Sequence, residues 1–132
     1  INFYYRGSGI CKDLIVLSAT FQGKVLNKDE IEKKQTDLIN QKKESQPSKI
    51  KTCGSTFKNP KNKKAWELIK LSNCSNMSVG GARISEKHNN FFLNDGKASS
   101  SDIENLIKKV KKEVFLKTGI NLELEIKIIG DK

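Results

Sequence analysis

The sequence predicts an α+β fold, in which a mixed or antiparallel sheet packs against helices. Residues 63–71 and 102–118 repeat apolar side chains at a spacing of three and four, which places them on one face of a helix. Residues 122–128 alternate apolar with charged side chains, the period of a half-buried strand. Each segment has an apolar face to cover, so we expect these helices and the sheet to share one core.

The first 48 residues predict one or two strands and a helix. The β-branched and aromatic run Ile1–Tyr5 predicts a strand, and Leu14–Phe21 predicts a buried strand of about eight residues. An amphipathic helix is expected from Asn27 or the next residue to about Lys43, with Asn27 as its cap. Pro47 breaks this helix, and a domain boundary is expected directly after it. The predicted domains are residues 1–48 and 49–132.

The later part of the chain carries clear signals for bends and helix ends. The pair Gly80-Gly81 predicts a tight bend or a close approach of backbone, and Phe91–Leu93 predicts a strand. Ser101 and Glu104 match a capping box, and Gly119 is expected to end the helix that follows. The last strand is expected to turn every second side chain toward the core, namely Leu122, Leu124 and Ile126.

Composition narrows the classes of function. The net charge of +10 invites a nucleic-acid interpretation, but the lysines are spread along the chain rather than gathered in one block. Three cysteines without C-x-x-C spacing and a single histidine argue against a zinc site and against a disulfide framework, so no metal is expected. This cysteine usage fits a reducing cytosol. With no apolar run of about 18 residues and no visible signal peptide, we expect a cytoplasmic protein without a membrane partner.

The stretch from Thr52 to Pro60 is the most distinctive in the chain. Gly54 can adopt positive φ and has no side chain to obstruct a ligand. Ser55 offers a hydroxyl, Lys58 a cation, and Asn59 both a donor and an acceptor. Such a donor-rich loop often faces an anionic ligand, although the simpler interpretation is a surface turn before a helix.

Two further charged residues lie where a side chain can reach a site. Arg6 follows the first predicted strand, in the turn Arg6–Gly9, and Glu125 lies on the polar face of the last strand. Taken alone, each is more simply a solvated charge.

Several separated motifs occur in one order and together carry a resemblance. They are Y-R-x-S at 5–8, Q-P at 46–47, G-S-T-F-K-N-P at 54–60, A-W-E-L-I at 65–69, V-G-G-A at 79–82, S-E-K-H-x-N-F at 85–91 and E-I-K-I-I-G at 125–130. This order resembles UDP-N-acetylenolpyruvoylglucosamine reductase, the FAD enzyme of peptidoglycan precursor synthesis. The resemblance covers nearly the whole chain.

The resemblance implies an NADPH-dependent flavin oxidoreductase and a role for each matched residue. Arg6 would stabilise charge on the substrate carboxylate as an enolate-like intermediate forms, and Glu125 would act beside it. Ser55 would protonate the carbon next to that carboxylate. Lys58 and Asn59 would lie along the UDP-sugar substrate. His88 would lie near its diphosphate or uridine end. This assignment is chemically consistent, because a hydride added to one alkene carbon requires a cation and a positioned acid on the other side.

The sequence also departs from the family. Cys53 stands where a small residue such as alanine or glycine is expected, so it would crowd the serine loop. The family's glycine-rich flavin segments are not found. Residues 1–48 are therefore interpreted as the tail of an FAD-binding α+β domain. The family's FAD-binding half, which this sequence lacks, is a candidate partner. The spacing from Arg6 to Ser55 is that of the shorter subclass, and the chain alone is expected to be inactive.

Two other interpretations stay open on the sequence. A small basic nucleic-acid-binding domain would gather its lysines on one face among aromatic side chains, but aromatic residues are few and no module signature is found. A remnant of a broken gene would carry the same motifs without activity.

Overall fold

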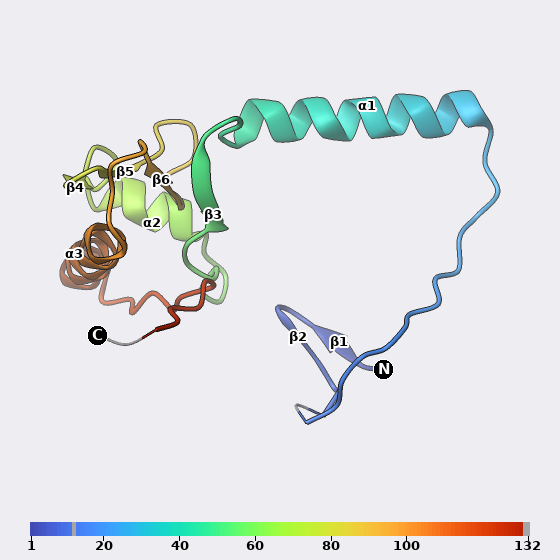
Figure 1. Ribbon diagram of the computed structural model, residues 1–132, viewed down its shortest axis with the longest axis horizontal. Coiled ribbons are helices and arrows are strands. Elements are labelled where there is room, and N and C mark those ends of the chain that lie inside the picture. The colour runs from blue at the N-terminus through green and yellow to red at the C-terminus, as the bar shows by residue number, and fades with distance from the viewer. Residues whose placement is uncertain (12, 131–132) are drawn as a thin grey trace. The chain divides into compact units, whose positions relative to one another are not determined.

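The computed structural model describes residues 1–11 and 13–130 (Figure 1). Its contacts divide the chain into two compact units, one from Ile1 to Lys33 and the other from Lys34 onward. The division falls inside the first helix, α1, which runs from Lys28 to Ser45. The domain boundary expected after Pro47 stays a prediction.

The first unit contains a small antiparallel hairpin. Strand β1 is Phe3–Tyr4 and strand β2 is Gly7–Ser8, with Phe3 opposite Ser8 and Tyr4 opposite Gly7. The chain reverses at Tyr5 and Arg6, and Arg6 has a φ of 58°. The strand predicted at the start of the chain is therefore confirmed, in a shortened form.

The buried strand expected at Leu14–Phe21 is wrong. The segment has no regular secondary structure, and its side chains are exposed, with Leu17 at 92% and Phe21 at 89%. A strand is stable only when neighbours satisfy its backbone and cover its side chains. Within residues 1–11 and 13–130, no segment pairs with this one.

Helix α1 confirms the helix expected after Asn27. The Asn27 side chain accepts a hydrogen bond from the Asp29 amide at 3.0 Å, and its carbonyl accepts one from Ile31 at 3.1 Å. None of the helix's residues is buried. The amide of Gln46 donates to Lys42, and Pro47 follows, so the helix stops where the sequence predicted.

The second unit is built on a four-stranded antiparallel sheet with the strand order β3-β6-β5-β4. These strands are β3 Lys51–Ser55, β4 Ser78–Val79, β5 Ala82–Ile84 and β6 Phe91–Asn94. Helices α2, Ala65–Leu71, and α3, Ser100–Thr118, pack on each other, and α3 also contacts β4 and β5 (Figure 1). The predicted α+β fold is confirmed.

One hydrophobic core joins the sheet and both helices. The stripes of α2 and α3 supply Ala65, Leu68, Ile69, Leu106, Ile107, Val110 and Val114, all buried. Phe57 from the loop after β3 is buried among them, and its ring meets that of Phe92 edge-to-face at 5.8 Å. The helical spacing therefore predicted the core-facing side chains correctly.

The turn between β4 and β5 needs both of its glycines. Gly80 has a φ of 54°, and a Cβ atom there would lie 2.5 Å from the carboxyl carbon of Asp102. A Cβ atom on Gly81 would lie 2.5 Å from the amide nitrogen of Ala98. The close backbone approach predicted from this pair is confirmed.

The capping box of α3 lies two residues earlier than predicted. Ser99 is the N-cap, its hydroxyl accepts from the Asp102 amide at 3.1 Å, and Asp102 accepts from the Ser99 amide at 2.9 Å. The pairing expected between Ser101 and Glu104 is wrong, because aspartate closes the box here in place of the usual glutamate. Gly119, in the left-handed region at φ 70°, ends the helix as expected.

The last apolar series follows the predicted register but forms no continuous strand. Leu122 is buried, and Leu124 and Ile126 are partly buried against the core. Pairing is limited to one isolated antiparallel bridge between Phe57 and Leu124. The strand expected over 122–128 is therefore wrong in extent, although its inward face is right.

Candidate functional site

The predicted proton donor, Ser55, lies at the end of β3. Gly54 takes a φ of 83° just before it, and the Gly54 amide donates to the Thr52 hydroxyl at 3.2 Å. The pairing of β3 with β6 is irregular between Thr52 and Ser55, so that Ser55 comes to lie opposite Phe91. The irregularity interrupts the ladder where the serine is presented, half-buried. Cys53 is exposed, so its thiol does not fill space inside the loop.

Asn90 holds the residues that follow Ser55. The residue is buried, with 3% of its surface exposed. The side-chain oxygen accepts from the Phe57 amide at 2.9 Å, and the side-chain nitrogen donates to the Phe57 carbonyl at 2.8 Å. The Asn90 carbonyl also accepts from the Thr56 amide at 2.8 Å. The loop after Ser55 is thus held in place by a residue that lies outside the loop.

The same loop pairs with the segment that carries Glu125. The Glu125 amide donates to the Thr56 carbonyl at 2.9 Å, and the Lys58 amide donates to the Glu123 carbonyl at 2.8 Å. Glu125 is half-buried. Two of the three predicted catalytic residues, distant in sequence, are therefore on directly paired segments.

Lys58 and Asn59 are anchored to neighbouring elements. The Lys58 ammonium lies 3.5 Å from the Glu123 carboxylate in a partly exposed pair, a contact that adds little stability. The side-chain oxygen of Asn59 accepts from the Ala65 amide at 2.9 Å. Asn59 thus satisfies one of the amides at the start of α2, a local role that the sequence interpretation did not include.

His88 lies in the loop between β5 and β6, in a partly desolvated aromatic setting. Its ring centre is 4.8 Å from that of Phe91 and 6.4 Å from that of Trp66. Burial lowers the pKa of His88 below its ordinary value, and a backbone hydrogen bond opposes this effect. The Asn90 amide donates to Nδ1 at 3.2 Å. Because Nδ1 accepts, the neutral ring carries its proton on Nε2.

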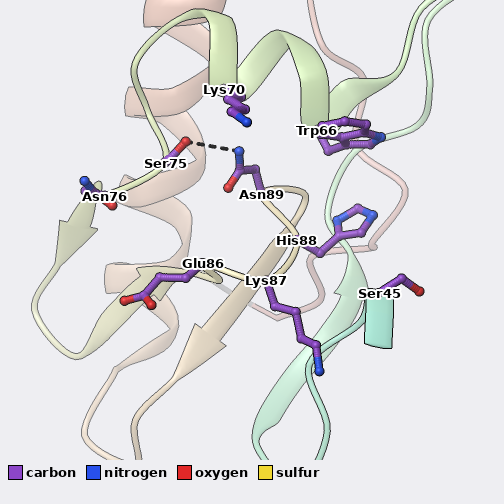
Figure 2. A pocket seen from close by; sticks show the side chains of 9 residues that line it. All are labelled: Ser45, Trp66, Lys70, Ser75, Asn76, Glu86, Lys87, His88 and Asn89. Carbon is purple, nitrogen blue, oxygen red and sulfur yellow. Dashed lines mark hydrogen bonds between the residues drawn. The ribbon is translucent and has the colours of Figure 1, made fainter. Parts of the chain in front are cut away.

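A surface pocket of about 570 Å³ opens beside His88 (Figure 2). Its wall combines an aromatic ring, two lysines, a carboxylate and several uncharged polar groups: Ser45, Trp66, Lys70, Ser75, Asn76, Glu86, Lys87, His88 and Asn89. The Asn89 side chain donates to the Ser75 hydroxyl at 3.0 Å, as Figure 2 shows. The Lys87 ammonium donates to the Lys43 carbonyl near the end of α1. The pocket can therefore offer cations and N–H donors to an anionic or polar ligand.

Comparison with known proteins identifies the family. The sequence model of the UDP-N-acetylenolpyruvoylglucosamine reductase C-terminal domain matches residues 46–129. The chain belongs to this reductase family. The chain is 51% identical to the reductase of Pelagibacter ubique in an alignment 132 positions long, which covers 98% of the chain and 44% of the relative. It is 41% identical to the reductase of Gluconobacter oxydans, covering 100% of the chain and 43% of the relative.

A solved structure of the family has the same fold. The crystal structure of the reductase from Thermus caldophilus superimposes with a TM-score of 0.68 at 34% identity, over 79% of this chain and 36% of that one. The chain spans less than half the length of the curated relatives it matches. The resemblance inferred from the sequence motifs is confirmed.

The third predicted catalytic residue, Arg6, belongs to the first unit. It is exposed, and its guanidinium lies 5.2 Å from the centre of the Tyr5 ring. The structure pairs the segments that carry Ser55 and Glu125, while a shared site for Ser55, Glu125 and Arg6 stays a prediction from the family resemblance.

Asn90 belongs to the motif S-E-K-H-x-N-F, but no role was predicted for it. A buried asparagine in a loop is not distinguishable by spacing from an exposed one, so its two bonds to Phe57 could not be predicted. In the described part of the chain, no group of three or more histidine, cysteine or acidic residues is arranged to hold a metal ion. None of the helices described combines the length and apolarity of a bilayer crossing.

Proposed function

We propose that this chain forms the substrate-binding portion of an enzyme that reduces UDP-N-acetylglucosamine enolpyruvate to UDP-N-acetylmuramate with NADPH and FAD. The observation that carries this proposal is the backbone pairing of the loop after Ser55 with the Glu125 segment, since it joins the two segments that carry the predicted hydroxyl donor and carboxylate. The family match over residues 46–129 supports the same assignment. The product is a precursor of peptidoglycan, so the protein would act in the cytoplasm in cell-wall synthesis.

The residues of this chain would handle the carboxylate side of the substrate. When bound, a flavin reduced by NADPH would supply the hydride for one carbon of the enolpyruvyl double bond. Negative charge would then develop at the neighbouring carbon and its carboxylate. Arg6 and Glu125 would stabilise this charge, and the Ser55 hydroxyl would give its proton to the carbon.

The remaining predicted contacts would lie along the substrate and at its nucleotide end. The ammonium of Lys58 would contact substrate oxygens, and Asn59 would lie along the substrate while its oxygen holds the start of α2. His88 would contact the diphosphate or uridine with the N–H of a neutral ring, because its Nδ1 already accepts a hydrogen bond.

The described residues do not by themselves fit a flavin. The first unit contributes a two-stranded hairpin and an exposed apolar segment, residues 14–21, and these do not enclose a flavin. We therefore propose that residues 1–48 are the tail of the FAD-binding domain and that residues 49–132 are the substrate domain. Residues outside this sequence would complete the flavin site.

Ligand binding to the 132-residue chain tests this proposal. UDP-N-acetylglucosamine is expected to change the fluorescence of Trp66, the one tryptophan, which lines the pocket. ADP at the same concentration is the matched control and is expected to give a smaller change. The alternative, a basic nucleic-acid-binding domain, rests on the +10 charge. It would be favoured by no response to the UDP-sugar and by retention on a DNA column with a steep salt slope.

A further inference from the structure

Asn90 links the two ends of the candidate site through all four of its polar groups. Its backbone N–H donates to Nδ1 of His88, and its backbone carbonyl accepts from Thr56. Its side-chain oxygen and nitrogen bond the amide and the carbonyl of Phe57. Asn90 is buried, with 3% of its surface exposed to solvent.

The bonds to Phe57 decide where Ser55 lies. Phe57 is two residues after Ser55, and its ring is locked in the core against Phe92. The segment between Gly54 and Phe57 has no helix to stiffen it, and the β3 pairing is irregular before Ser55. The paired bonds from Asn90 therefore supply the rigidity that a short loop with an irregular ladder lacks.

The bond to His88 decides which nitrogen of the ring can donate. Without an N–H aimed at Nδ1, the two neutral tautomers of a histidine differ little in energy. The Asn90 amide selects the form with the proton on Nε2. The same residue thus sets the backbone beside Ser55 and the donor presented by His88.

We propose that Asn90 is a positioning residue that couples the proton-donating end of the site to its nucleotide-binding end. The roles of Ser55 and His88 rest on the proposed function, whereas the coupling itself is a property of this chain and can be tested without activity. Asn90→Ala removes both side-chain bonds to Phe57. Its neighbour Asn89, 7% exposed and bonded to Ser75, provides a matched control.

Hydrogen exchange and ¹⁵N NMR on the 132-residue chain make the test. In Asn90→Ala, exchange of the Phe57 amide is expected to quicken on the order of tenfold or more, relative to the Val110 amide in α3. Alanine keeps the backbone amide that donates to Nδ1 of His88, so the His88 ring nitrogens are expected to shift only through movement of the backbone at residue 90 once its side-chain bonds to Phe57 are lost. Asn89→Ala is expected to change neither the relative exchange of Phe57 nor the His88 nitrogens.

A conservative variant adds a pH signature. In Asn90→Asp the carboxyl group must be protonated to donate to the Phe57 carbonyl, since a carboxylate would face a carbonyl oxygen. Protection of Phe57 relative to Val110 is therefore expected to be near wild type at low pH and to fall as pH rises. This variant also decides the matter if Asn90→Ala does not fold.

Equal effects of Asn90→Ala and Asn89→Ala on Phe57 and His88 would overturn the proposal, as would Asn90→Asp protection that does not vary with pH. If the NMR effects occur but Ser55 proves not to be the proton donor, the coupling by Asn90 stands and the proposed function fails. The two results are therefore separable.

Discussion

Replacing Phe57 by alanine tests whether the G-S-T-F-K-N-P stretch is part of the core. Phe57 is 1% exposed and the largest of the fully buried side chains. Truncating such a side chain costs about 3–5 kcal/mol. The edge-to-face contact with Phe92 at 5.8 Å and 83° adds roughly 0.5–1.5 kcal/mol beyond area, which favours the upper part of that range.

This cost is large against the stability of the second unit. At roughly 0.05–0.15 kcal/mol per residue, a unit from residue 34 to 130 unfolds with about 5–15 kcal/mol. With a urea slope of about 2 kcal/mol/M, a loss of about 4 kcal/mol lowers the midpoint by about 2 M. Trp66 lies within the same unit, so its fluorescence reports the transition.

Phe115→Ala is the matched control, because that phenylalanine lies on α3 and is 47% exposed. It is expected to change stability by about 0.5 kcal/mol or less. A double-mutant cycle of Phe57→Leu and Phe92→Leu is expected to show a coupling of about 0.5–1.5 kcal/mol. A cost below about 1 kcal/mol for Phe57→Ala would refute the burial on which the site depends.

Three further predictions concern the caps, turns and titrating groups. In urea denaturation, Ser99→Ala is expected to lower the free energy of unfolding by about 1 kcal/mol, and Ser101→Ala is expected to leave it nearly unchanged. The reverse order would indicate that Ser101, and not Ser99, caps the helix. Gly80→Ala is expected to lower the melting temperature through its positive φ and its clash with Asp102, and an unchanged melting temperature would contradict this geometry. The pKa of His88 is lower in the folded protein than in the unfolded chain. The contribution of His88 to the free energy of unfolding is therefore complete above pH ~6.5 and is lost as the pH falls toward the folded pKa. Stability curves of His88→Gln should lack that part of the pH dependence, and identical curves would argue that the ring is not desolvated.

Hydrophobic spacing predicted the helices and their buried faces well, because burial of a stripe is a local property of the sequence. Leu106, Val110 and Val114 follow one another at helical spacing and all lie in the core. The strand predicted at Leu14–Phe21 was wrong because strand formation is not a local property. The composition of this segment favours a strand, but pairing depends on neighbours that the described residues do not supply.

The candidate site was predicted in part. Motif order identified Ser55 and Glu125, and the structure pairs the segments that carry them. The loop after Ser55 is held by three bonds from Asn90, two to Phe57 and one to Thr56, which join segments more than 30 residues apart in sequence. Neither propensity nor periodicity contains such information. The bond from the Ala65 amide to Asn59 is local, and it was missed because residue spacing does not show which backbone group a side-chain amide will bond.

The central claim is that Ser55 supplies a proton to the substrate. Joining this chain to the part of the Pelagibacter ubique reductase that it does not cover would give a full-length protein for stopped-flow measurement of the two half-reactions of the proposed function. Ser55→Ala is expected to leave reduction by NADPH nearly unchanged and to slow reduction of the enolpyruvyl substrate by about 10²–10⁴-fold. Ser101→Ala, on the exposed side of α3, is expected to leave both unchanged. Equal slowing of both half-reactions by Ser55→Ala, or of neither, would show that Ser55 is not the proton donor.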